Sequence, residues 1–346
     1  MHKYPSKIRV GVAGATGYAG QELVSLLSRH PNVDLVAGMS SSADSAARPL
    51  PRLARVWNGQ LEPLDIAKLS TNTDVTFLAL PEKAAAEVAP PLIAAGVRVI
   101  DLSGAFRIRD NGDRARWYPA TATLPEGTAY GLVEHDAAAI VNAKLIACPG
   151  CYPTAALLSL LPLTKAGLID IAAGIIVDAK SGISGAGRTA NDRTHFSENH
   201  GSVAAYGVLG HRHVAEMQQE LALAAGLSSG ALNDEVTFVP HLVPLDRGIL
   251  ETIYVRTKPG VTGEQIADAM QTSYANAPFV RLTGDALPEI KHVAYTNFCD
   301  IGWKFDAASR RLVLIAVIDN LVKGAAGQAI QNFNLIHDLD ERTALL

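Results

Sequence analysis

Cys151 is the residue of this sequence best placed for covalent chemistry. It stands in the segment ACPGCYPT (147–154), between an apolar run typical of a strand and a pattern that predicts a helix near 153–166. The positive end of a helix dipole favours the thiolate form of a cysteine, and the thiolate is the nucleophile. Pro153 suits the first helical turn, where its missing N–H is not needed. We therefore expect Cys151 to act as a nucleophile.

The other two cysteines leave one alternative open. Cys148 and Cys151 form a C-x-x-C motif, which is also compatible with a redox pair. A zinc site is disfavoured because the sequence holds no second C-x-x-C. Cys299 is expected to be a small buried apolar side chain. Three cysteines are too few for a disulfide framework, which favours a reducing, cytoplasmic setting.

Histidines are the candidates for proton transfer, because imidazole titrates near neutral pH. They gather at His195, His200, His211 and His213. A metal site is disfavoured, since His211 and His213 lack an acidic or cysteine companion at ligand spacing. On the start of a helix these two side chains would point to nearly opposite sides, so we expect only one of them to face a site.

A glycine loop after the first apolar run indicates dinucleotide binding. Gly14, Gly17 and Gly20 lie between a predicted strand at 8–13 and a helical pattern that ends near His30. Glycine lets the backbone turn tightly, so that a pyrophosphate can meet the N–H groups of the helix. The spacing is G-x-x-G-x-x-G rather than the strict fingerprint, and a turn that serves packing alone is the competing interpretation.

The end of the second predicted strand favours NADP over NAD. NAD sites usually carry an acidic residue there to bond the ribose hydroxyl. Here Ser40 and Ser41 follow the strand, and Arg48 offers charge for a 2′-phosphate. Asp44 argues in the opposite direction, since a nearby carboxylate would suit NAD.

A second glycine loop, SGISGAGR (181–188), follows another predicted strand. Its small residues would let the backbone approach a planar ring or an anion. A flexible turn explains the same composition.

The order of the elements predicts an α/β fold with two domains. In the first half, strands at 33–39, 74–80, 97–102 and 145–147 alternate with helices, the pattern of a Rossmann-type doubly wound parallel sheet. The second half carries strands at 174–179, 236–245, 250–257 and 312–318 with a helix at 263–274, which predicts an α+β domain with a mixed sheet. A helix at 324–336 is expected to pack back on the first domain. We expect a dinucleotide-binding domain at 1–150 plus about 320–346, and a catalytic and dimerisation domain at 151–319.

Composition supports a protein that buries large cores. Hydrophobic residues make up 48% of the 346 residues and charged residues 18%, which excludes global disorder and hints at surface covered by another subunit. The formal net charge of −4 gives no excess of positive charge of the kind that indicates nucleic-acid binding. Prolines and a glycine interrupt the uncharged stretch between Lys144 and Lys165, so we interpret it as a strand, a turn and a core helix rather than a membrane span.

This combination resembles the N-acetyl-gamma-glutamyl-phosphate reductases of the semialdehyde dehydrogenase superfamily, over nearly the whole chain. The matching segments are GATGYAG (14–20), PGCYPT (149–154), SGISGAG (181–187), HRH (211–213) and DNLVKGAAGQ (319–328). The second of these is the specific one, whereas the glycine loops are shared with many oxidoreductases.

The resemblance implies an NADPH-dependent reduction of an acyl phosphate to an aldehyde in arginine biosynthesis, by a homodimer or homotetramer. It implies that Cys151 is the nucleophile, that His213 transfers protons and that His211 contacts the substrate. The segment DLSGAFR (101–107) departs from the family pattern by Gly104 and Ala105, so only two of its residues are carried over as substrate contacts, Ser103 and Arg107. The residues expected to bind the cofactor are Gly14, Thr16, Gly17, Tyr18, Gly20, Ser40, Ser41, Ser181, Gly182, Gly185 and Asn320.

Two other functions stay open. One is the same chemistry on another acyl phosphate, such as aspartyl phosphate or a carrier-bound aminoadipyl phosphate. The other is a non-catalytic NADP-binding redox sensor that uses Cys148 and Cys151 as its switch.

Overall fold

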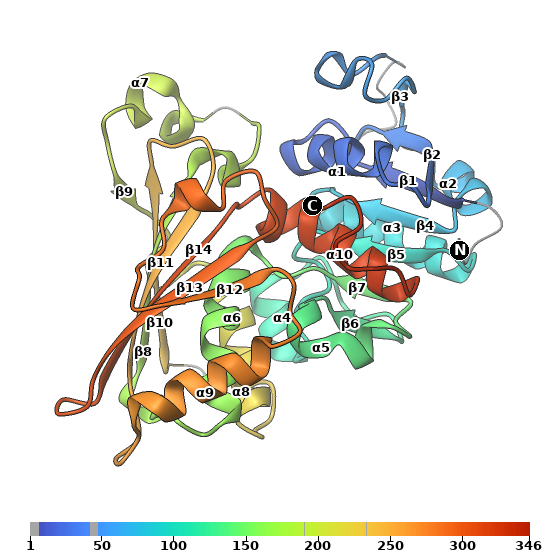
Figure 1. Cartoon of the computed structure of the whole chain (residues 1–346). Coiled ribbons are helices and arrows are strands. Elements are labelled where there is room, and N and C mark those ends of the chain that lie inside the picture. The colour runs from blue at the N-terminus through green and yellow to red at the C-terminus, as the bar shows by residue number, and fades with distance from the viewer. Residues whose placement is uncertain (1–6, 42–47, 190, 233) are drawn as a thin grey trace. The chain divides into compact units, whose positions relative to one another are not determined.

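The computed structural model describes residues 7–41, 48–189, 191–232 and 234–346. The chain divides into two compact units (Figure 1). The first unit comprises residues 1–107, 114–149 and 325–346, and the second comprises 108–113 and 150–324.

The first unit is built on a parallel sheet. Within its described residues, seven strands lie in the order β3-β2-β1-β4-β5-β7-β6, all neighbours running parallel. They are β1 (Ile8–Ala13), β2 (Val33–Met39), β3 (Leu61–Glu62), β4 (Val75–Leu78), β5 (Arg98–Asp101), β6 (Thr128–Tyr130) and β7 (Leu145–Ala147). The chain moves outward from β1 in both directions, which places the ends of β1 and β4 at the switch point where such sheets bind ligands.

Helices cover both faces of this sheet, and two apolar clusters result. One cluster joins β1 to helices α1, α5 and α10, and the other joins the second face to α2 and α3. The helices are α1 (Tyr18–Ser28), α2 (Ile66–Asn72), α3 (Glu82–Ala94), α4 (Asn111–Trp117), α5 (Val133–Ile140) and α10 (Gly327–Ile336). Phe333 and Ile330 of α10 are buried beside Phe77 of β4, so the C-terminal helix belongs to the core of this unit.

The second unit carries a mixed sheet. In the part of it that is described, seven strands lie in the order β12-β13-β14-β11-β8-β10-β9, with β8 parallel to β10 and β12 parallel to β13. They are β8 (Ile175–Gly182), β9 (Ala204–Ala205), β10 (Val236–Val243), β11 (Ile249–Arg256), β12 (Val280–Gly284), β13 (Cys299–Asp306) and β14 (Arg311–Ile318).

Helix α6 is the centre of this unit. It packs on β11 and β14 and is flanked by α8 and α9, so these three helices cover one face of the sheet (Figure 1). Residues 152–164 of α6 are all buried, which accounts for the uncharged sequence there. The helices are α6 (Cys151–Lys165), α7 (Phe196–Asn199), α8 (His213–Ala224), α9 (Gly263–Tyr274) and a π-helical turn η6 (Val322–Ala326).

Short 3-10 turns complete the connections. They are η1 (Pro51–Leu53), η2 (Ile171–Ala173), η3 (Ile183–Ala186), η4 (Asp192–Thr194) and η5 (Ile290–His292).

The predicted fold class is confirmed, with a parallel sheet in one half and a mixed sheet in the other. Strands β1, β2 and β7 and helix α9 have the predicted bounds. The strand expected at 174–179 continues to Gly182, so the second glycine loop begins inside β8. The sequence analysis did not predict β3, β6, β9, β12 and β13. The first three have only two or three residues, which is too short to show alternation, whereas β12 and β13 have five and eight residues and were missed as well.

A buried carboxyl group on β11 makes the second unit sensitive to pH. Glu251 is fully buried, neither of its carboxyl oxygens has a hydrogen-bond partner among the described residues, and burial raises its pKa well above the usual 4.5. The folded state therefore holds a proton that the unfolded chain releases above pH 4.5, so stability falls as the pH rises beyond that value.

We expect Glu251→Gln to be more stable than the parent at pH 8, because the folded parent must keep a proton on the buried carboxyl group that the unfolded chain releases. The gain should shrink as the pH falls toward 4, where the parent carboxyl is protonated in both states. Thermal unfolding followed from pH 4 to 8 measures it. A parent and variant whose melting curves shift in parallel over that range would contradict the assignment.

Candidate active site

The first glycine loop has the geometry that a dinucleotide needs. Gly14 has φ +90°, and a Cβ there would lie 2.2 Å from the carbonyl oxygen of Ala79. A Cβ on Gly20 would lie 2.2 Å from the carbonyl oxygen of Gly14, so both positions require glycine. Gly17 caps α1 without any side chain, which leaves the first-turn N–H groups available for phosphate oxygens. Thr16 and Tyr18 lie beside them, and this loop therefore fits a nicotinamide dinucleotide.

The end of β2 presents hydroxyl groups at the same sheet edge. Ser40 is buried and its N–H donates to the carbonyl of Glu62, whereas Ser41 is exposed. Arg48 is exposed and bridges β3 through its backbone. Asp44, whose carboxylate would favour NAD, lies outside the described residues.

Ser103 and Arg107 form a buried polar cluster at the end of β5. The hydroxyl of Ser103 donates to Asp101 at 2.7 Å, and the Arg107 guanidinium donates to the carbonyls of Cys148 and Leu102, each at 2.8 Å. Burial raises the pKa of Asp101 to about 6, although Ser103 and Arg107 act in the opposite direction. The same burial raises the pKa of the Cys148 thiol. This cluster fixes the backbone just before the Cys151 segment.

Cys151 is the first residue of α6 and is partly buried. Gly324 lies against it, since a Cβ on Gly324 would come within 2.8 Å of the Cys151 Cβ. The thiol therefore stands at the positive end of a 15-residue helix, with backbone rather than side chain on one side. This is the predicted position.

His213 lies over the residue that precedes the cysteine. A Cβ on Gly150 would come within 2.6 Å of His213 Nε2, so the imidazole ring packs directly on the Gly150 backbone. Glu216, one turn further along α8, is fully buried and accepts the Gly150 N–H at 2.9 Å. Its other carboxylate oxygen is 3.9 Å from His213 Nε2. The carboxylate thus holds both the histidine and the N-terminus of α6.

His211 occupies the same side of the site, contrary to the sequence-based expectation. Its ring centroid is 4.7 Å from that of His213 and 5.9 Å from that of Tyr152. The expectation assumed that both histidines are helical, but α8 begins at His213 and His211 precedes it. The His213 N–H donates to His211 Nδ1 at 3.2 Å, which leaves the proton of a neutral His211 on Nε2. Burial, aided by Arg212, lowers the pKa of His211 to about 4.

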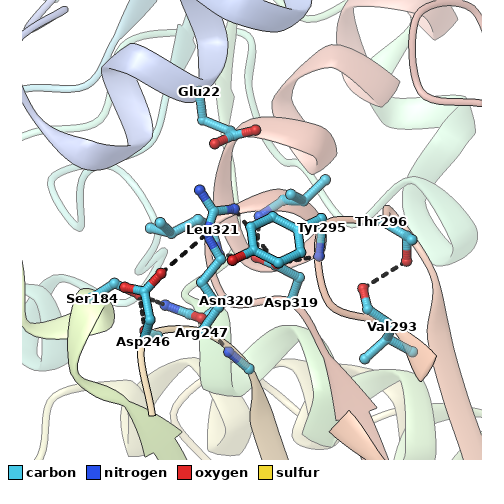
Figure 2. Close-up of polar contacts among 12 residues, drawn as sticks. Glu22, Ser184, Asp246, Arg247, Val293, Tyr295, Thr296, Asp319, Asn320 and Leu321 are labelled. Atoms are coloured by element: carbon cyan, nitrogen blue, oxygen red, sulfur yellow. Dashed lines mark hydrogen bonds and ion pairs between the residues drawn. The ribbon is translucent and has the colours of Figure 1, made fainter. Parts of the chain in front are cut away.

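The second glycine loop is tied to the sheet by Asn320 (Figure 2). The Asn320 amide accepts the Gly248 N–H at 2.7 Å and donates to the Ser184 hydroxyl at 2.9 Å. A Cβ on Gly185 would lie 3.1 Å from the Ser181 hydroxyl, and one on Gly182 would lie 2.6 Å from the Asp246 carbonyl. The loop backbone thus packs closely against its neighbours, as glycine allows.

Next to Asn320, the fully buried Asp319 is held by three backbone N–H groups. They belong to Tyr295, Leu321 and Val322, at 2.7–2.9 Å, and Arg247 lies 3.5 Å away (Figure 2). These contacts fix the backbone on both sides of Asn320.

Sequence reasoning missed three residues of this site. They are Glu216, Tyr152 and Tyr206, and the two tyrosine hydroxyls lie 3.0 Å apart. The His213-to-Glu216 spacing of three residues at a helix start was the available signal for the carboxylate, because such residues share a helix face. Nothing in the sequence signals the tyrosine pair, which joins α6 to a loop far along the chain.

Comparison with known proteins agrees with this geometry. Residues 9–143 match the family described as "Semialdehyde dehydrogenase, NAD binding domain", and residues 151–320 match "Semialdehyde dehydrogenase, dimerisation domain". Relatives named N-acetyl-gamma-glutamyl-phosphate reductase include one from Shouchella clausii, 44% identical over 98% of both chains, and one from Brevibacillus brevis, 43% identical over the same shares. The chain belongs to the semialdehyde dehydrogenase family.

Solved semialdehyde dehydrogenases share the fold. Aspartate semialdehyde dehydrogenase II from Vibrio cholerae superposes with a TM-score of 0.72 at 19% identity, covering 96% of this chain and 99% of that one. The enzyme from Candida albicans, solved with NADP, gives 0.65 at 17% identity, covering 96% and 99%. The family matches and the relatives named reductases, rather than the likeness in fold, show that this semialdehyde dehydrogenase is an oxidoreductase with a nicotinamide cofactor. No helix in the described part of the chain is long and apolar enough to cross a membrane.

We expect Gly150→Ala to lower turnover by about 10²–10⁴-fold, the range for loss of general acid–base catalysis, because the added methyl group displaces the His213 ring. His213→Asn should have an effect of similar size. The measurement is the rate of cofactor reduction with a semialdehyde substrate. Gly263→Ala is the matched control, since a Cβ there meets nothing closer than 3.9 Å. Full turnover of Gly150→Ala would show that the ring position is unimportant.

Proposed function

We propose that this enzyme reduces N-acetyl-γ-glutamyl phosphate to N-acetylglutamate semialdehyde with NADPH and releases phosphate, as a step of arginine biosynthesis. The supporting observation is Cys151 at the start of α6 beneath His213, in a chain 44% identical to relatives that bear that substrate's name. Resemblance in fold to aspartate semialdehyde dehydrogenases does not favour their substrate, because identity there is 19% or less.

The reaction begins with the Cys151 thiolate. Its sulfur attacks the acyl carbon, the bond to the phosphate oxygen breaks, and inorganic phosphate leaves as a thioester forms. NADPH, when held by the first glycine loop, would supply a hydride to the thioester carbon. The resulting thiohemiacetal collapses by breaking the carbon–sulfur bond, which releases the aldehyde and returns the thiolate. His213 accepts the thiol proton before the attack. During the collapse it exchanges a proton with the oxygen on the former acyl carbon.

Other side chains serve binding in this proposal. Arg107 presents a guanidinium to the acyl phosphate, beside Ser103, and His211 donates from Nε2 to a substrate oxygen. The cofactor is NADP(H), held by the first glycine loop and by Ser40 and Ser41, with Arg48 near the 2′-phosphate. Ser181, Gly182, Gly185 and Asn320 bound the nicotinamide region.

We also infer self-association through the exposed sheet face of the second unit. The family match for this unit is a dimerisation domain, and Ile176 and Tyr254 are 45% and 43% exposed on adjacent strands, paired in register. A homodimer or homotetramer would cover them. The three free cysteines suit a cytoplasmic compartment.

The reverse reaction tests the proposal. With N-acetylglutamate semialdehyde, phosphate and NADP, we expect phosphate-dependent NADPH formation that Cys151→Ser abolishes while NADP affinity stays nearly unchanged, because the cofactor loop is a separate element. Absorbance at about 340 nm reports the rate. Activity with aspartate semialdehyde alone would keep the mechanism and change the substrate. Loss of NADP binding in Cys151→Ser would mean that the variant is misfolded.

The redox-sensor alternative makes the opposite prediction for Cys148. This thiol is buried with a raised pKa, and burial of this kind keeps a cysteine inert. We therefore expect Cys148→Ser to keep turnover within about threefold of the parent, since the thiol takes no part in the chemistry. Parallel assays with and without dithiothreitol measure it. A variant that loses activity or its response to oxidant would favour the sensor.

A further inference from the structure

A cavity in the second unit shares Tyr206 with the cysteine site, and the rest of its lining takes no part in the site described above. It has a volume of about 280 Å³, and its lining includes Arg193, Asn199, Tyr206 and Leu242. This volume is near the lower end for small-molecule sites, so it suits a few functional groups rather than a whole cofactor.

The sheet register places this cavity at the cysteine end of the unit. Ser181 pairs with Leu242 on one side and with Ile249 on the other, and Leu242 also pairs with Ala204. Ile249 pairs with Ile318, whose side chain lies beside Gly324, the residue that packs against Cys151. These residues form one row across five strands, so the cavity and the cysteine lie at the same end of the strands, although beside different strands.

Tyr206 is the wall between the cavity and the cysteine site. Its hydroxyl lies 3.0 Å from that of Tyr152, the residue after Cys151. Its ring centroid is 5.6 Å from that of His211. Tyr206 therefore borders both the cavity and the aromatic side chains next to Cys151.

Asn199 offers the cavity an amide group that can hydrogen-bond to a ligand. The residue is 7% exposed, lines the cavity, and its side-chain amide has no hydrogen-bond partner among the described residues. Its amide is not among the polar atoms of the described chain that are closed off from solvent, so it opens onto the cavity, where water or a ligand can bond to it. Its carbonyl accepts and its NH₂ donates, which matches the N–H and C=O of another amide.

The charges around the cavity suit a carboxylate attached to that amide. The Arg193 guanidinium pairs with no carboxylate of the described chain, and its charge acts on the Tyr206 hydroxyl. Asp192 and Glu198 also line the cavity. All three charged side chains are exposed, so water screens each of these charges, and Arg193 is the cation among the described lining residues. Leu242, Ala204 and Ala205 supply apolar side chains to the lining.

We propose that this cavity is the subsite for the N-acylated amino-acid end of the substrate. Asn199 pairs with the acetamido group, Arg193 binds the α-carboxylate, and the acetyl methyl group lies against Leu242 and the two alanines. The inference rests on the proposed function and extends it, since it names the groups that recognise the end of the substrate far from the reacting carbon.

Three aldehydes separate these contacts in the reverse reaction with phosphate and NADP. N-acetylglutamate 5-semialdehyde carries both groups, 5-oxopentanoate has only the carboxylate, and 4-acetamidobutanal has only the acetamido group. We expect Asn199→Leu to lower kcat/KM by roughly 10–100-fold for the two acetamido compounds, and Arg193→Gln to do so for the two carboxylates. Each variant should leave the remaining aldehyde within about threefold of the parent, because that compound lacks the matching group.

Ser197→Ala is the matched control, because Ser197 lies on the same short helix, is exposed and does not line the cavity. Its kcat/KM should equal that of the parent for all three aldehydes. The rate at which iodoacetamide alkylates Cys151 should be the same in every variant, which reports an intact nucleophile.

Loss by the same factor on all three aldehydes would show a structural role for Asn199 or Arg193 and would overturn the subsite. Unchanged kinetics in both variants would overturn it as well. Failure of the proposed function looks different, because the parent enzyme itself would then turn over aspartate semialdehyde, or no semialdehyde, in preference to the N-acetyl compound.

Discussion

The hydrogen bond from the Gly150 N–H to the buried carboxylate of Glu216 holds the cysteine site of this protein together. It joins the N-terminus of α6 to α8, at the point where the nucleophile and the imidazole meet. The carboxylate needs this donor, because a fully buried charge without hydrogen bonds is strongly unfavourable. The small Gly150 backbone in turn leaves room for the His213 ring. Gly150 thus positions Glu216, His213 and the N-terminus of α6. The rest of the second unit brings α6 and α8 together at this residue.

The sheet of the second unit determines where the site lies, because its register brings particular strand ends together. Four neighbouring strands of this sheet, β14, β11, β8 and β10, bury one row of residues, from Ile318 through Ile249 and Ser181 to Leu242. The glycine loop starts where β8 leaves this row, and Asn320 fastens it to the turn before β11. Because register fixes which residues are neighbours, segments that are distant in the sequence converge at this end of the strands.

Much of this arrangement could be predicted from local patterns. The strand, turn and helix around Cys151 appear in the order of residues, and so does the glycine loop that opens α1. The features that could not be predicted from the sequence depend on contacts between segments that are distant in the chain. Glu216 looks like any charged residue of an amphipathic helix until α8 packs on α6, and Asn199 looks like a loop residue until β9 joins β10. His211 was misplaced for a local reason, since one residue decided whether it belonged to the helix.

The two neighbouring histidines have different electrostatic settings, and this difference separates their roles in the proposed reaction. With a pKa of about 4, His211 stays neutral at pH 7, and the His213 N–H leaves it a proton on Nε2 only. Such a ring donates one fixed hydrogen bond and does not exchange protons in the neutral range. His213 instead has a buried carboxylate 3.9 Å away, which stabilises the imidazolium that forms when the ring accepts a proton. Proton transfer therefore falls to His213 and substrate orientation to His211, although the two rings are 4.7 Å apart.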